Sequence, residues 1–164
     1  MFATPRSWAA VSDLLIAGFT DEILRIKIEG NIGAAEAAGL LKYMKNNELL
    51  PDIEAILSGS YMEQNTMPFH ATLDVYYLLI QNLVHAIGSE LRRLGDKWKE
   101  YTDNTVVFIS NIEDFPLELK KSYIAQLCQM DEVICNGEFV TKYIYNDSCS
   151  QQVSKLIQEL DYIK

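Results

Sequence analysis

Arg6 is the residue of this sequence whose position most clearly suggests chemistry. It follows Thr4 and Pro5, a pair typical of a helix start, because Thr caps free backbone N–H groups and Pro fits the first helical position. A cation is unfavourable at that end of a helix, and no acidic residue lies three or four positions further on. We therefore expect either an exposed arginine in water or an anion such as phosphate at this turn, which Trp8 would anchor.

Familiar catalytic motifs are absent from the sequence. It contains no G-x-x-x-x-G-K-S/T phosphate loop, no H-E-x-x-H zinc motif and no G-x-S-x-G nucleophile elbow. His70 and His85 lack metal-ligand spacing with each other or with a cysteine, so we expect structural or surface histidines and no metal site. Cys128, Cys135 and Cys149 form an odd set without a C-x-x-C pair, as expected of reduced thiols in a cytoplasmic protein.

Two other patterns have both a chemical and a structural interpretation. The stretch GNIG at Gly30 to Gly33 matches the G-x-x-G loop of one RNA-binding fold, but a helix stop followed by a helix start explains both glycines. Cations gather near the end of a predicted long helix, where they are favourable. These cations are Arg92, Arg93, Lys97 and Lys99. We favour a solvated helix end there over an anion-binding site.

Composition and charge narrow the class of protein. The chain has 164 residues, 49% of them hydrophobic, which suits a globular fold with a sizeable core. Its formal net charge of −9 argues against a nucleic-acid-binding module and against docking on an anionic membrane, because both need clustered Lys and Arg. The sequence has no apolar run of the roughly 20 residues that span a bilayer, and its N-terminal residues lack the basic stretch and apolar core expected of a signal peptide.

Helical patterns dominate the chain and must position these residues. Apolar residues recur at steps of three and four from Leu73 to Leu94, which predicts a long central helix. Thr105 to Ile112 is rich in β-branched residues and suits a strand or a helix, and its helical neighbours favour a helix. Ile26 and Ile28 alternate with charged residues, as in a strand, so a strand is a minor alternative to the second helix. The other expected helices cover about 5–17, 20–29, 31–45, 52–58, 115–130, 138–145 and 148–163, with an irregular connection over 60–68.

One stretch resembles a known family. The segment TPRSWAAVSDLL is similar to the sensor-2 segment of MoxR-like AAA+ ATPases, where a Pro-Arg-x-Trp-like helix start opens the helical lid. The resemblance continues through IEGNIGAAEAAGLLKYMKNNELLPDIEAIL and covers Ala3 to Leu57. It implies that Arg6, supported by Pro5 and Trp8, reaches the γ-phosphate of ATP. The phosphate loop, the Mg²⁺-binding acidic segment and the arginine finger would lie on an upstream domain, which would bind the ATP and Mg²⁺.

The sequence thus predicts an all-α, lid-like bundle of about seven to nine helices in a single domain. Residues 1–59 would form the lid and residues 69–164 a helical extension packing on it. The resemblance implies an excised fragment that is inactive alone, whose parent ATPase couples hydrolysis to remodelling of a protein client in a homo-oligomeric ring. The alternative is a stand-alone acidic module that binds a protein and has no nucleotide role. An upstream reading frame with a phosphate loop would favour the first hypothesis.

Overall fold

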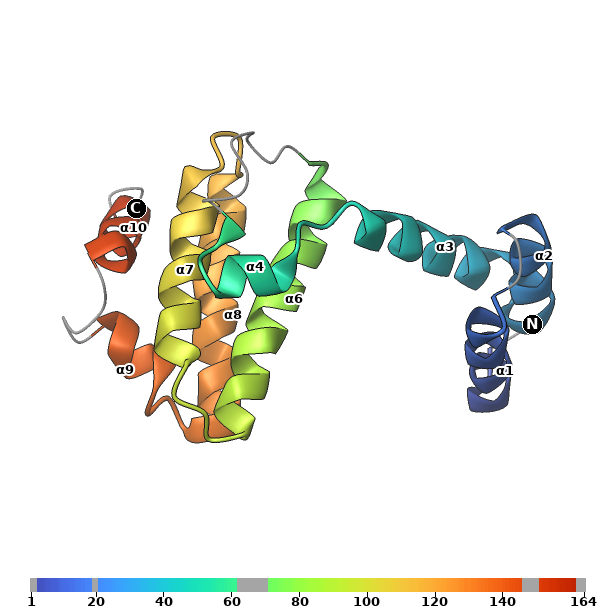
Figure 1. The fold of residues 1–164 in the computed structure, drawn as a ribbon, viewed down its shortest axis with the longest axis horizontal. Helices are drawn as coiled ribbons and strands as arrows, with labels where there is room; N and C mark the ends of the chain where they lie inside the picture. Colours follow the sequence, from blue (N-terminus) through green and yellow to red (C-terminus); the bar gives the residue numbers. More distant parts are fainter. Residues whose placement is uncertain (1–2, 19–20, 62–70, 146–150, 162–164) are drawn as a thin grey trace. The chain divides into compact units, whose positions relative to one another are not determined.

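A computed structural model describes residues 3–18, 21–61, 71–145 and 151–161. These residues form nine helices and no strand (Figure 1), which confirms the predicted all-α class. They divide into two compact units, an N-terminal unit, Met1–Leu49, and a C-terminal unit, Leu50–Lys164. None of the described helices is both long and apolar enough to cross a membrane.

The N-terminal unit contains three helices around a small apolar core. They are α1 (Pro5–Ile16), α2 (Asp21–Ile32) and α3 (Ala34–Glu48), and α2 packs against both of the others. Because side chains three or four apart share one face of a helix, α2 buries Leu24, Ile28 and Ile32 together. Val11 of α1 and Ala37 of α3 complete the buried cluster.

Gly30 does not end the second helix, contrary to the sequence prediction. Helix α2 continues through Gly30 to Ile32, because one more turn places Ile32 beside Ile28, and both side chains are fully buried. The break comes at Gly33, whose φ of 94° lies in a region that side chains other than glycine rarely adopt. The third helix therefore begins at Ala34 rather than at about residue 31.

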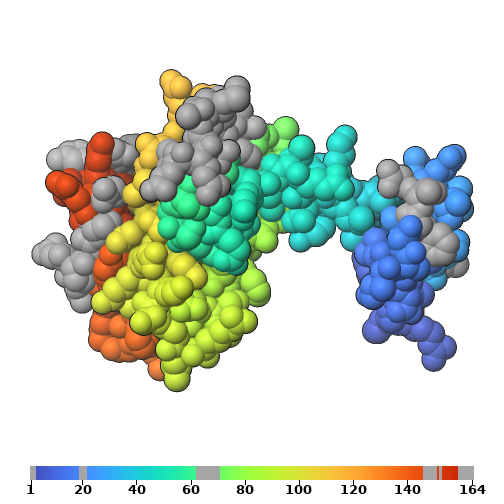
Figure 2. Space-filling model, in the orientation of Figure 1, coloured from blue at the N-terminus to red at the C-terminus, as the bar shows by residue number. Residues whose placement is uncertain are grey.

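The C-terminal unit is built around three long helices. Helix α6 (Leu73–Arg92) packs against both α7 (Trp98–Asn111) and α8 (Leu117–Cys135), while the short α4 (Ile53–Leu57) and α10 (Gln151–Asp161) lie against α7. Figure 2 shows the side chains of α4 meeting those of α6 and α7. The remaining described helix of this unit, α9 (Val140–Tyr145), packs against α8 and α7.

The predicted central helix is confirmed as α6, but three of its apolar positions are not in the core. Most of its apolar stripe is buried, whereas Leu73 is 54% exposed and Tyr77 is 47% exposed. Leu94 lies beyond the helix end in a left-handed conformation with a φ of 54°. Since the helix stops at Arg92, the periodic pattern overstates it by two residues.

The β-branched segment from Thr105 to Ile112 is helical up to Asn111, as predicted. Thr102 and Thr105 are fully buried, and their hydroxyls donate to the carbonyl oxygens of Trp98 and Tyr101, one turn earlier. Satisfying these hydroxyls within the helix removes the cost of burying them. The Thr105 hydroxyl also hydrogen-bonds the phenol of Tyr123 on α8, which joins the two helices.

The division between the units falls after Leu49, not within 60–68. Helix α4 is capped by Asp52, as predicted, and the Asn104 side chain on α7 donates to the Leu57 carbonyl at 2.8 Å. Ile56 and Leu57 are buried in the core of the C-terminal unit, so α4 belongs to that unit. Most of the predicted irregular connection, residues 62–68, lies outside the described residues.

Candidate functional site

The start of α1 has the geometry that the sequence predicts. The Thr4 hydroxyl accepts a hydrogen bond from the Ser7 backbone N–H at 3.2 Å, and Pro5 occupies the first helical position. One of the free N–H groups of the helix start is therefore satisfied by the cap. The helix ends at Ile16, with Ala17 as its C-cap and Gly18 at a positive φ.

Arg6 lies exposed in the first turn of this helix. No acidic residue is present in that turn, and the guanidinium has no hydrogen-bond or ion-pair partner among the described residues. Arg25, an exposed arginine on α2, instead pairs with Glu29 at 3.0 Å. Arg6 thus combines a free planar donor group with the positive end of a helix, an arrangement suited to an anion.

Trp8 does not anchor this turn in the way expected from the sequence. Its side chain is 42% exposed and is not part of the described apolar core of the N-terminal unit. Val11, which is 2% exposed, and the partly buried Leu14 hold α1 in place instead. Trp8 therefore adds an exposed aromatic surface to the turn that carries Arg6.

The other sequence candidates do not come together into a second site. His85 is exposed on α6, His70 lies outside the described residues, and no cluster of potential metal ligands occurs in the part of the chain that the structure describes. Cys128 and Cys135 are partly buried free thiols, and Cys149 is not described. Burial raises the pKa of the Cys128 thiol, which disfavours the nucleophilic thiolate.

The basic cluster lies at the turn between α6 and α7. Arg92 ends α6, Arg93 follows it, and Lys97 and Lys99 flank the start of α7. All four side chains are exposed. A solvated helix end, the interpretation favoured from the sequence, agrees with this placement.

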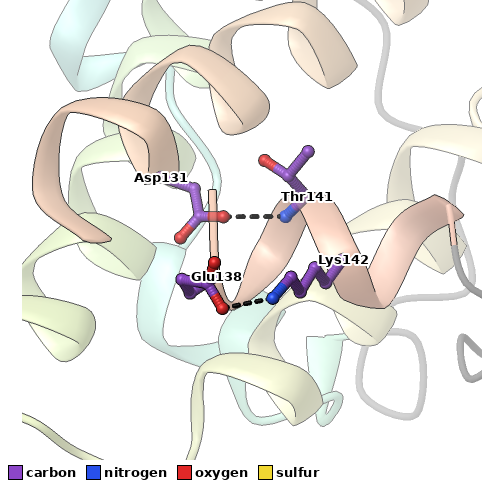
Figure 3. A network of polar contacts seen from close by, with 4 residues as sticks. All are labelled: Asp131, Glu138, Thr141 and Lys142. Atoms are coloured by element: carbon purple, nitrogen blue, oxygen red, sulfur yellow. Dashed lines mark hydrogen bonds and ion pairs between the residues drawn. The ribbon is translucent and has the colours of Figure 1, made fainter. Parts of the chain in front are cut away.

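Asp131 is a buried polar residue that the sequence does not reveal. It lies on α8, is 0% exposed, and its Oδ2 accepts the Thr141 backbone N–H at 2.9 Å (Figure 3). Its Oδ1 and the Thr141 hydroxyl are buried without a hydrogen-bond partner in the structure. In the same view, Glu138 pairs with Lys142 on α9. Asp131 therefore ties the start of α9 to α8, and its position within an apolar helix pattern gives no signal of this.

Searches of protein-family models, curated proteins and solved structures find no match to this chain. In the part of the chain that the structure describes, the fold is all-α and the candidate site is an exposed arginine at a helix start, with no partner among the described residues. The resemblance to MoxR-like AAA+ ATPases stays a prediction.

Proposed function

We propose that this chain is the lid and C-terminal helical extension of a MoxR-like AAA+ ATPase. In this proposal Arg6 contacts the γ-phosphate of ATP held, with Mg²⁺, by an upstream domain of the same protein. The observation that carries the proposal is the exposed Arg6 guanidinium, which has no described partner at the start of α1. An arginine that lacks an internal partner is available to an anion on another domain.

The thin core of the N-terminal unit supports a role in docking on a further domain. Its described core contains only five buried residues, although units of this size need good packing to be stable alone. Several large apolar side chains on the same unit stay exposed and are available for contact with a further domain. These are Trp8, Leu15, Ile16, Ile23, Ile26, Tyr43 and Leu49.

The proposed contact would make the lid sensitive to the state of the nucleotide. ADP lacks the γ-phosphate, so the Arg6 contact would be made with ATP and lost after hydrolysis. A lid that binds only one of the two states converts hydrolysis into movement. We extend the proposal to a homo-oligomeric ring that remodels a protein client in the cytoplasm.

The test is ATP turnover by the complete gene product that carries this chain. A charge-assisted hydrogen bond to an anion contributes about 1.5–3 kcal/mol, so Arg6→Ala should reduce turnover or ATP affinity roughly 10- to 100-fold. Arg6→Lys should restore part of it, because lysine keeps the charge but not the planar fork. The affinity for ADP should change little.

Arg25→Ala is the matched control, because it removes an exposed guanidinium from the same unit whose partner is Glu29. It should leave turnover unchanged. Residues 1–164 alone should not hydrolyse ATP, since they contain no phosphate loop. A complete gene product without ATPase activity, or an Arg6→Ala variant as active as the parent, would show that the proposal is wrong.

A further inference from the structure

A hollow of about 430 Å³ opens on the C-terminal unit near the starts of α7 and α9. Its volume falls within the range of roughly 300–1,000 Å³ found for small-molecule sites. The lining combines three aromatic rings with charged side chains. The lining residues are Asp96, Trp98, Lys99, Glu138, Phe139 and Tyr143.

The three rings are arranged at right angles around Trp98. The Trp98 and Tyr143 ring centroids are 5.5 Å apart with an interplanar angle of 89°, and the Trp98 and Phe139 centroids are 5.8 Å apart at 86°. The Tyr143 hydroxyl donates to the Asp103 carboxylate, with oxygen–oxygen distances of 2.9 and 2.8 Å, which orients its ring. The site is therefore preorganised by α7 and α9, which pack together.

A cation of the chain itself already lies against two of these rings. The Lys99 Nζ is 5.4 Å from the Trp98 ring centroid and 5.8 Å from that of Tyr143. Both distances are within the 6 Å or so at which an aromatic ring attracts a cation. The rings thus favour positive charge, and Lys99 is exposed, so an external cation can displace it.

One of the two carboxylates that line the hollow, Glu138, is already engaged in an ion pair, and the carboxylate next to Tyr143 is engaged as well. Glu138 is paired with Lys142, and Asp103 accepts from Tyr143. Asp96 is exposed and has no described partner. A primary ammonium needs acceptors for three N–H donors, whereas a quaternary ammonium has none to satisfy and is easier to desolvate. The aromatic walls and the single available carboxylate suit the quaternary group better.

We propose that this hollow binds a quaternary ammonium group, which takes the place of the Lys99 ammonium over Trp98 and Tyr143. The inference is independent of the proposed nucleotide role, because it uses only residues of the C-terminal unit. Binding should be weak, in the millimolar range, since the hollow is open to solvent and Arg92, Arg93 and Lys97 lie in the adjoining turn.

The test follows Trp98 fluorescence in the full chain. The sequence has two tryptophans, so Trp8→Phe makes Trp98 the single reporter. Titration with tetramethylammonium chloride should give a saturable change that sodium chloride at equal ionic strength does not give. Lys99→Ala should tighten binding about fivefold, because it removes the cation that the ligand replaces over Trp98 and Tyr143. Phe139→Ala should weaken binding, because Phe139 lines the hollow and packs edge-on against Trp98.

Lys97→Ala is the matched control, since it removes an exposed cation from the same turn that does not lie over the rings. It should tighten binding much less than Lys99→Ala does. Phe139→Leu keeps apolar bulk without a ring and should also weaken binding, which separates ring loss from misfolding. Choline and free trimethyl-lysine are further probes. The one that binds more tightly shows whether the site favours a small quaternary ammonium ligand or a methylated lysine side chain. No saturable signal in the Lys99→Ala variant, or equal effects of Lys97→Ala and Lys99→Ala, would overturn the proposal.

Discussion

Replacement of Asp131 by alanine should destabilise the C-terminal unit through the loss of one buried acceptor. Asp131 is fully buried, and its Oδ2 accepts the Thr141 N–H at 2.9 Å near the start of α9. Its backbone carbonyl also accepts the Gly137 N–H at 3.3 Å, a contact that alanine keeps. The substitution therefore removes the side-chain link between α8 and α9 while leaving the turn between them in place.

The expected magnitude follows from these contacts. Loss of a hydrogen bond to a carboxylate, with its donor left buried, costs about 1.5–3 kcal/mol. The lost side-chain atoms leave a small cavity that costs about 1 kcal/mol more. Removing the unpaired Oδ1 returns about 1 kcal/mol, because a buried acceptor without a partner is itself unfavourable. We expect a net decrease of about 2 kcal/mol in the free energy of unfolding, or about 8 °C in Tm.

Urea unfolding followed by Trp98 fluorescence in the Trp8→Phe background reports on the C-terminal unit, because Trp98 lies in it. Glu132→Ala is the control, since it removes a carboxylate from the neighbouring, exposed position of α8. That variant should stay within about 0.5 kcal/mol of the parent. If Asp131→Ala is as stable as Glu132→Ala, the link between α8 and α9 does not stabilise the unit, and the reasoning is wrong.

Two further predictions concern backbone strain and pH. Gly33→Ala should destabilise the N-terminal unit by about 2 kcal/mol, because Gly33 has a positive φ. Gly30→Ala should stabilise the unit by up to about 1 kcal/mol, because Gly30 lies within α2 and a Cβ there meets open space. Hydrogen exchange of the α2 and α3 amides measures both effects. Burial raises the pKa of Tyr123 and of Cys128 above their ordinary values of 10.0 and 9.0. The unfolded chain then loses these protons first, so the contribution is fully present up to about pH 8, roughly one unit below the ordinary pKa of Cys128, and is lost as pH rises. The urea concentration at the midpoint of unfolding should fall as pH rises from about 8 to about 10.5. In Cys128→Ala the decrease at the lower end of this pH range should be smaller.

Local signals predicted most of the fold. The caps at Thr4 and Asp52, the long apolar stripe of α6 and the helical β-branched segment before Asn111 all appear in the structure as expected. Capping and helical periodicity depend on residues within one or two turns of each other, so a sequence displays them directly. The position of Arg6 in the first turn of α1 follows from the same signals, while its role at a nucleotide stays a proposal.

Other features depend on contacts between segments far apart in the chain. The sequence predicts that Gly30 ends the second helix, but the burial of Ile32 in the core of the N-terminal unit extends that helix, and the break comes at Gly33.

Trp98 and Tyr143, 45 positions apart, carry no shared motif, and they form a site because α7 and α9 pack together. The sequence by itself determined which stretches are helical and where several of them begin and end. The tertiary structure alone decided which side chains are buried, where the two units divide and which rings meet, because those outcomes depend on long-range packing that competes with local preference.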